Sequence, residues 1–246
     1  MTAPLHQWSK HAGTTIKWLS PDSEEAYNKH LANTEHARLL NLFGWVDVDI
    51  EYTFNSEGFR VDEFDSRSNW MAIGCSFTQG TGVNVQDRWT TAVSQEIKLH
   101  CWNLGIAGAA GDTCFRVAKH YVPKLLPKFV VYLEPRYNRT EIISSQSHAP
   151  LVLNWAYDYK NWSGTYIKEL LLNEENLNLA AEKNREAIRS ICLQHNIPLI
   201  VYAPDAYCTL IRDEKQIDLG RDLLHPGRLN NRAFAQVVAK DVEKLC

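Results

Sequence analysis

The sequence of 246 residues lacks any long hydrophobic run. No stretch approaches the roughly 20 consecutive apolar residues that span a bilayer, and the first 18 residues hold no apolar core of a signal peptide. These absences predict neither a membrane partner nor secretion by the usual route, and they favour a cytoplasmic protein. Internal repeats and low-complexity tracts are also missing, so a repeat architecture is not expected.

A strong excess of either charge is absent as well. The formal net charge is −3 and the isoelectric point is about 6.3, which gives no general attraction for nucleic acid or an anionic surface. We therefore expect no nucleic-acid partner. The six cysteines form no C-x-x-C pair, so neither a zinc site nor a disulfide framework is indicated, and mostly buried free thiols are expected.

Two glycine-containing loops lack the features of nucleotide-binding motifs. The loop G-T-G at 80–82 has no G-K-[ST] ending, and GIAGAAG at 105–111 does not match G-x-G-x-x-G. Binding of a phosphate or a dinucleotide is therefore poorly supported by either loop.

The remaining composition is that of a soluble globular protein, and its pattern changes near residue 65. Residues 1–65 contain an acidic helix start at 22–25, a helical pattern that runs to Gly44, and a turn at 55–58 between alternating segments. We interpret this region as an extension, a helix followed by a β-hairpin, that packs on the main domain. Residues 66–246 are predicted to form that domain.

Short apolar runs alternate with helical patterns from residue 69 onward, which is typical of βα units around a parallel sheet. Asp112 is the expected N-cap of the helix after the second strand. Functional sites in such sheets form beyond the carboxyl ends of the strands, and this places Ser76 among the candidates. The predicted strands are NWMAIG at 69–74, CWNLGI at 101–106, FVVYLE at 129–134 and PLIVYA at 198–203.

Ser76 directly follows the first predicted strand, where a strand-to-helix turn can expose its hydroxyl above the sheet. A serine hydroxyl is a poor nucleophile unless an oriented base removes its proton. Asp222 and His225 lie three residues apart before Pro226 and Gly227, a pair that favours a turn. A loop there would present both side chains together. Without Ser76 nearby, His225 would be read as a helix cap and Asp222 as a solvated loop acid.

Three segments, in this order and spacing, resemble the first, second and last motif blocks of the SGNH hydrolases, or GDSL-type esterases and lipases. They are GCSFTQG at 74–80, NLGIAG at 103–108 and DLLH at 222–225, and the similarity covers about residues 69–240. The upstream segments GW at 44–45 and YTFNSEGFR at 52–60 look like what precedes this domain in many bacterial and phage members. The resemblance implies a flavodoxin-like α/β/α sandwich, and it adds a phage- or virus-associated protein to the expected settings.

The resemblance also implies roles for individual residues. Ser76 would be the nucleophile, His225 the general base and acid, and Asp222 the group that orients the imidazole. The backbone N–H groups of Ser76 and Gly108 would form the oxyanion hole, with Gly105 and Gly111 as alternative donors. No metal and no organic cofactor are expected.

Two positions depart from the family pattern. Cys75 stands where the usual first block has aspartate; GCSFT is a known variant of the block, and a cysteine nucleophile is the alternative reading. The third block, usually G-x-N-D, is replaced by LEPRYNRTE at 133–141. Asn138 is the nearest match to the asparagine that donates to the oxyanion, and Arg136 or Arg139 could face that anion instead.

A cluster of aromatic residues follows the third predicted strand, on the side of the sheet where the site should lie. Such rings suit stacking on sugars, so we expect an ester substrate such as an O-acetylated glycan, and equally allow that the rings only pack against the extension. The alternatives to hydrolysis are a glycan-binding module with weak or no catalysis, and an O-acyltransferase. The aromatic residues are Tyr137, Trp155, Tyr157, Tyr159, Trp162 and Tyr166.

Overall fold

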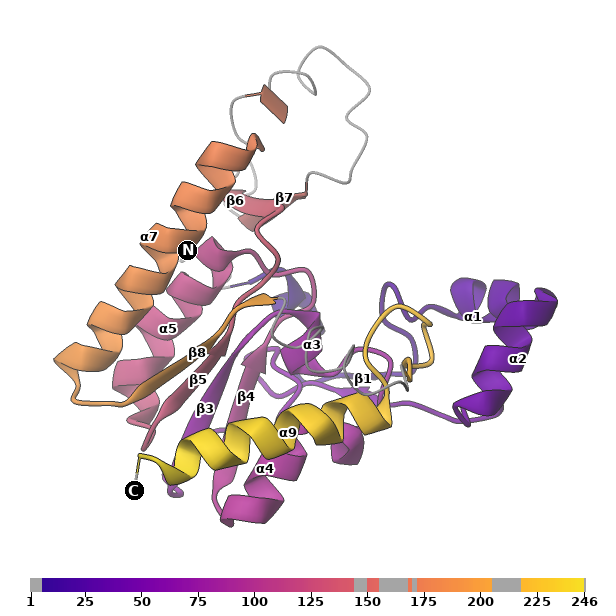
Figure 1. Cartoon of the computed structure of the whole chain (residues 1–246), viewed down its shortest axis with the longest axis horizontal. Coiled ribbons are helices and arrows are strands. Elements are labelled where there is room, and N and C mark those ends of the chain that lie inside the picture. The colour runs from indigo at the N-terminus through magenta and orange to yellow at the C-terminus, as the bar shows by residue number, and fades with distance from the viewer. Residues whose placement is uncertain (1–5, 144–149, 155–167, 170–171, 205–217, 246) are drawn as a thin grey trace.

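A four-stranded parallel sheet forms the centre of the protein (Figure 1). The computed structural model describes residues 6–143, 150–154, 168–169, 172–204 and 218–245. The strand order is β4-β3-β5-β8, which matches the start of the flavodoxin-like order 2-1-3-4-5. All four predicted strands are confirmed: β3 (Asn69–Gly74), β4 (His100–Gly105), β5 (Val130–Leu133) and β8 (Leu199–Tyr202).

Helices cover both faces of this sheet. Successive residues of β3 point to opposite faces, so Met71 and Ile73 pack beneath one helical pair, whereas Trp70 and Ala72 pack beneath the other. Burial on both faces explains why the strand reads as a continuous apolar run. The predicted three-layer α/β/α class is confirmed. The layers are α5 (Gly111–Leu125) with α7 (Glu174–Gln194), and α4 (Trp89–Ile97) with α9 (Arg228–Glu243) (Figure 1).

The start of helix α5 differs from the prediction. Ala110, and not Asp112, occupies the N-cap position, because the helix begins at Gly111 and Asp112 falls in its first turn. The Asp112 carboxylate instead accepts hydrogen bonds from the backbone N–H of Glu141 and from the Asn184 side chain. The N-cap prediction for Asp112 was therefore wrong, and the residue ties three chain segments together.

A two-stranded antiparallel sheet follows β5 and was not predicted. It consists of β6 (Arg139–Ile143) and β7 (Pro150–Asn154), with Arg139 opposite Asn154. An ion pair of 2.6 Å between the buried Glu141 carboxylate and the partly exposed Arg116 of α5 attaches this sheet to the main domain. Within the described ranges, no helix combines the length and the apolar composition needed to cross a membrane.

Residues 6–65, which we call the N-terminal extension, contain short elements beyond the strand ends (Figure 1). The single predicted helix is divided in two because Asn33 ends the first helix and caps the second, where its side chain accepts from the His36 N–H. The elements are η1 (Gln7–His11), β1 (Thr15–Ile16), α1 (Glu24–Ala32), α2 (Thr34–Leu42) and β2 (Tyr52–Thr53).

The predicted hairpin is only partly correct. The turn at 55–58 forms, with the Gly58 N–H donating to the Asn55 carbonyl at 2.9 Å. However, β2 pairs antiparallel with β1, which lies more than thirty residues upstream, and not with the residues after the turn. The extension has its own apolar cluster, which includes Leu40 and Trp45 and reaches Val83 and Ala107 of the main domain.

The cysteines that the structure describes are buried free thiols, as predicted. Burial raises the pKa of Cys192 to about 11 and also raises the pKa of Cys101 and Cys114. These three thiols are therefore protonated and poorly nucleophilic at neutral pH.

Candidate active site

Ser76 lies at the carboxyl end of the central strand β3. The strand ends at Gly74, Cys75 takes the extended N-cap conformation, and Ser76 is the first residue of the short helix α3 (Ser76–Gln79). Ser76 is 6% exposed and borders a cavity. The strand-to-helix turn predicted from the sequence therefore presents the hydroxyl at the edge of the sheet.

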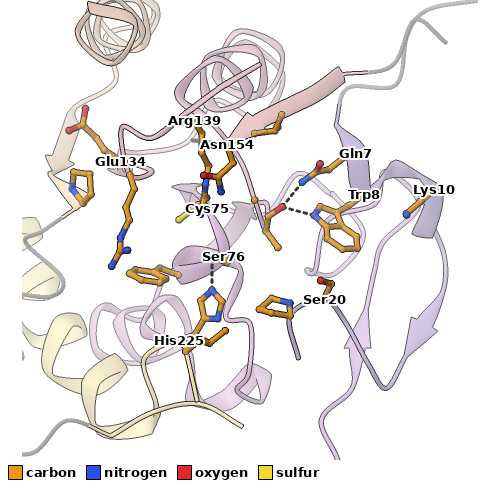
Figure 2. Close-up of a pocket in the computed structure, with 18 residues that line it drawn as sticks. Gln7, Trp8, Lys10, Ser20, Cys75, Ser76, Glu134, Arg139, Asn154 and His225 are labelled. Atoms are coloured by element: carbon orange, nitrogen blue, oxygen red, sulfur yellow. Dashed lines mark hydrogen bonds between the residues drawn. The ribbon is translucent and has the colours of Figure 1, made fainter. Parts of the chain in front are cut away.

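The three predicted catalytic residues meet at this edge. His225 Nε2 lies 2.8 Å from Ser76 Oγ, although 149 residues separate them in the chain (Figure 2). On its other side the imidazole Nδ1 hydrogen-bonds the carboxylate of Asp222. The Phe77 ring packs edge-on against the imidazole, with centroids 5.5 Å apart. The arrangement is a continuous chain of hydrogen bonds from hydroxyl to imidazole to carboxylate.

The environment of Asp222 keeps it ionised. Burial raises the pKa of this carboxyl, but hydrogen bonds from the His225 ring and from the backbone N–H groups of His225 and Leu224 outweigh burial, and the pKa falls below its usual value. An ionised Asp222 favours the tautomer with the proton on Nδ1. His225 Nε2 is then free to accept the proton of Ser76.

The loop that carries Asp222 and His225 closes on itself. Gly220 N–H donates to the His225 carbonyl at 2.7 Å, and Gly227 N–H donates to the Asp218 carbonyl at 3.0 Å. The Asp218 carboxylate accepts from the first N–H groups of α9, at 2.8 and 2.9 Å. The acid and base are therefore fixed by a short closed loop at the start of a packed helix.

Gly82 lets this loop approach the segment after Ser76. The Arg221 N–H donates to the Gly82 carbonyl at 2.9 Å. Gly82 has a φ of +77°, and a Cβ there would lie 2.9 Å from Asp222 Oδ1. A side chain at this position would therefore push against the Asp222 carboxylate.

The N-terminal extension holds the same loop from the other side. Arg221, the neighbour of Asp222, forms a buried ion pair with Asp22, with contacts of 2.8 and 2.9 Å. The Trp45 indole N–H donates to the Leu219 carbonyl at 2.7 Å. Sequence reasoning missed these contacts, because nothing local to either segment indicates its partner.

Of the three glycines considered as oxyanion donors, Gly108 is the one that lines the cavity beside Ser76. It lines the same cavity as Ser76 and has a φ of +78°. In the described part of the chain, neither the Ser76 N–H nor the Gly108 N–H donates a hydrogen bond. Gly105 N–H, in contrast, already donates to the Asn103 side chain at 3.0 Å, and Gly111 does not line this cavity. Ser76 and Gly108 are thus the predicted residues that line the cavity with N–H groups uncommitted within the described structure, and their role as oxyanion donors stays a prediction.

The extension also fixes the loop that carries Gly108. The Gln7 side-chain N–H₂ and the Trp8 indole N–H both donate to the Ala107 carbonyl, at 2.6 and 2.7 Å (Figure 2). A Cβ on Gly108 would lie 2.9 Å from Gln7 Nε2. The extension therefore contacts both loops of the site.

His6 anchors these contacts and should make the stability of the protein depend on pH. Burial lowers its pKa from 6.5 to about 4, and its Nδ1 accepts from the Trp8 N–H, which protonation would prevent. Between these values the unfolded chain binds more protons than the folded one, so the free energy of unfolding should fall by about 3 kcal/mol as the pH drops from 6.5 to 4. Urea unfolding across this range should show the fall, and His6→Gln should flatten it. Equal slopes in both proteins would contradict the assignment.

The segment at 133–141, which stands in place of the family's third block, does not bring Asn138 to the cavity wall. Asn138 does not line the cavity beside Ser76, and its buried Oδ1 has no hydrogen-bond partner in the described structure. The cavity wall after β5 is formed instead by Glu134, Arg136 and Arg139, and Asn154 of β7 joins them (Figure 2). The oxyanion role of Asn138 stays a prediction.

The cavity has a volume of about 570 Å³ and is shared by the extension and the main domain. Trp8 forms part of its wall on the extension side (Figure 2). Of the predicted aromatic cluster, only Tyr137 is described; its hydroxyl contacts Glu134 and Arg185. The other five rings, at 155–166, lie outside the described residues.

Comparison with family models and with curated proteins gives no match. Solved structures of similar shape include a member of the lipolytic protein G-D-S-L family from Veillonella parvula DSM 2008, with a TM-score of 0.39, 14% identity, and coverage of 70% of this chain and 97% of that one. A lipase/acylhydrolase from Enterococcus faecalis has a TM-score of 0.39, 13% identity and coverage of 72% and 96%. Est24, a carbohydrate acetylesterase from Sinorhizobium meliloti, has a TM-score of 0.35, 12% identity and coverage of 73% and 100%. The likeness is distant, so the function is argued below from the site itself.

Proposed function

We propose that the protein is a serine esterase that cleaves carboxylic esters through an acyl-enzyme. The observation that carries this proposal is the hydrogen-bond chain from Ser76 through His225 to the buried Asp222, beside the uncommitted N–H groups of Ser76 and Gly108. A nucleophile, an oriented base and two oxyanion donors at one cavity are the groups that acyl transfer requires.

The proposed reaction has two steps, acylation of Ser76 and hydrolysis of the acyl-serine. Ser76 Oγ attacks the ester carbonyl while His225 Nε2 takes the hydroxyl proton, and the oxyanion receives hydrogen bonds from the two backbone N–H groups. The tetrahedral intermediate collapses when His225 returns the proton to the leaving alcohol, which leaves an acyl-serine. Water then attacks the acyl carbon, gives its proton to the same imidazole, and releases the acid as Ser76 regains its proton.

For the substrate, we propose the O-acetyl group of a carbohydrate. The cavity is large enough for a sugar ring, and the partly exposed aromatic side chain of Trp8 forms part of its wall. If a sugar hydroxyl replaced water in the second step, the same site would act as an O-acyltransferase. Acetate release from an acetylated polysaccharide, against acetyl transfer to a free sugar, distinguishes the two reactions.

A fluorophosphonate probe tests the proposal directly. We expect covalent labelling of the peptide that contains Ser76, because the reagent needs an activated serine and an oxyanion site. His225→Gln should slow the labelling by at least about 10³-fold, since the general base is lost, and heat-unfolded protein should not react. Folded wild-type protein that stays unlabelled under these conditions would instead support a glycan-binding module without catalysis.

A further inference from the structure

The charges of the cavity wall are unbalanced. Among the described residues of that wall, Glu134 is the acidic one. Both its oxygens are bound by Arg185, at 2.7 and 3.0 Å, and the Tyr137 hydroxyl adds a hydrogen bond of 2.8 Å. Its negative charge is therefore already compensated by an arginine outside the cavity wall. It is not available to neutralise Arg136 or Arg139.

Arg136 and Arg139 line this cavity, and neither forms an ion pair with an acidic residue in the part of the chain that the structure describes. Arg136 is exposed and forms no ion pair within the described residues. The Arg139 guanidinium donates a hydrogen bond of 3.4 Å to the Ala109 carbonyl, and among the described residues its buried Nε has no hydrogen-bond partner. Guanidinium groups bind carboxylates and other oxyanions through two parallel hydrogen bonds, and they do so more strongly where solvent is partly excluded.

The positions of these arginines fit a contact with substrate. Arg139 begins β6 opposite Asn154, and Figure 2 shows both residues on the same side of the cavity as Cys75, near Ser76. The ion pair between Glu141 of β6 and Arg116 of α5 holds this strand against the helix. Lys10 adds a further exposed cation to the wall from the extension.

We propose that the cavity recognises an ester that carries an anionic group, such as a carboxylate or a sulfate, which Arg136 and Arg139 bind while Ser76 attacks the ester carbonyl. This inference rests on the proposed esterase function and defines its substrate class. An acidic sugar that carries an O-acetyl group has both the ester and the anionic group that this site would bind.

Matched substrates test the inference. We would compare 3-acetoxybenzoate and 3-acetoxybenzenesulfonate with the neutral 3-acetoxybenzamide, each corrected for its imidazole-catalysed rate. The wild type should prefer the anionic esters by at least about tenfold in kcat/KM, and 0.5 M salt should reduce this preference because it screens the exposed charges. The ratio of the carboxylate to the sulfonate rate shows which anion the site favours.

Variants assign the preference to residues. Arg136→Gln and Arg139→Gln should each reduce the anionic preference several-fold, and Arg139→Lys should keep much of it. Lys128→Gln is the matched control, because Lys128 is exposed at the opposite edge of the sheet, where its N–H bonds the Asn69 carbonyl at the start of β3. A wild-type preference near one, or a preference that survives both Gln substitutions, would overturn the inference.

A binding experiment separates this inference from the esterase proposal. Calorimetric titration of Ser76→Ala with 3-acetamidobenzoate and 3-acetamidobenzamide needs no hydrolysis. Tighter binding of the carboxylate, lost in the Arg136→Gln background, supports the anion site even if no ester is cleaved. Equal binding of the two amides rejects it, whatever the outcome of fluorophosphonate labelling.

Discussion

Ser76→Ala should lower kcat for ester hydrolysis by about 10⁴ to 10⁶-fold, with KM changed only a few-fold. The hydroxyl is the group 2.8 Å from His225 Nε2, and without it no acyl-enzyme can form. The oxyanion donors are backbone groups and remain, so some rate above that in water persists. Single-turnover and steady-state hydrolysis of a chromogenic acetate ester measures both quantities.

Cys75→Ala is the matched control for this substitution. Cys75 borders the same cavity one residue earlier, but the imidazole hydrogen-bonds the hydroxyl of Ser76. We expect the alanine variant at 75 to keep kcat within about tenfold and to fold as the wild type does. If Cys75→Ala abolished hydrolysis and Ser76→Ala kept it, the nucleophile would be the thiol.

The parts of the structure that the sequence predicts are those set by local patterns. The strand β3 is visible because its residues are buried on both faces, and Ser76 is a candidate because it follows that strand. Asp222 and His225 are recognisable as a pair because a single short loop holds both. Only their meeting with Ser76 is long-range, and the rule that sites form at the carboxyl ends of parallel strands supplies it.

The parts that could not be predicted depend on contacts between distant segments. Strand β2 pairs with the distant strand β1, and Tyr52 of β2 is buried in the apolar cluster of the extension. The turn that directly follows β2 does not determine this pairing. The sheet of β6 and β7 is held on helix α5 by two contacts: the Asp112 carboxylate accepts from the Glu141 N–H, and the Glu141 carboxylate forms an ion pair with Arg116. Asn184 of α7 donates to the same Asp112 carboxylate. The family resemblance made Asn138 a candidate oxyanion donor, and that role stays a prediction; the structure adds Arg136 and Arg139 to the cavity wall.

The N-terminal extension contacts both loops that border Ser76, so it forms part of the candidate site. Gln7 and Trp8 fix the loop of Gly108 through one carbonyl, and Asp22 and Trp45 fix the loop of His225. Ser76, in contrast, follows the central strand β3 directly, as the first residue of the short helix α3. The extension thus contacts the two loops that carry Gly108 and His225 and holds them beside Ser76.

Arg221→Met should lower the free energy of unfolding by about 3–5 kcal/mol, because it leaves Asp22 buried without its counter-charge. Arg221 also donates to the Val48 and Lys17 carbonyls, at 3.0 and 3.1 Å, and its guanidinium lies 4.0 Å from the Trp18 ring centroid. The loss of these contacts releases the loop next to Asp222. We therefore expect kcat of the folded protein to fall by about 10²-fold, as for a catalytic group that is misplaced by about 1 Å.

Urea unfolding and kcat measured well below the unfolding midpoint separate stability from positioning in this test. Asp22→Asn should act like Arg221→Met, and the double variant should lose less stability than the sum of the two, because the residues contact each other. The exposed pair of Arg38 and Glu35, on helix α2 of the same extension, is the control, and Arg38→Met should change neither the midpoint nor kcat appreciably. A role confined to stability predicts wild-type kcat for the folded Arg221→Met protein. That result would show that the loop of His225 keeps its geometry without the ion pair between Arg221 and Asp22.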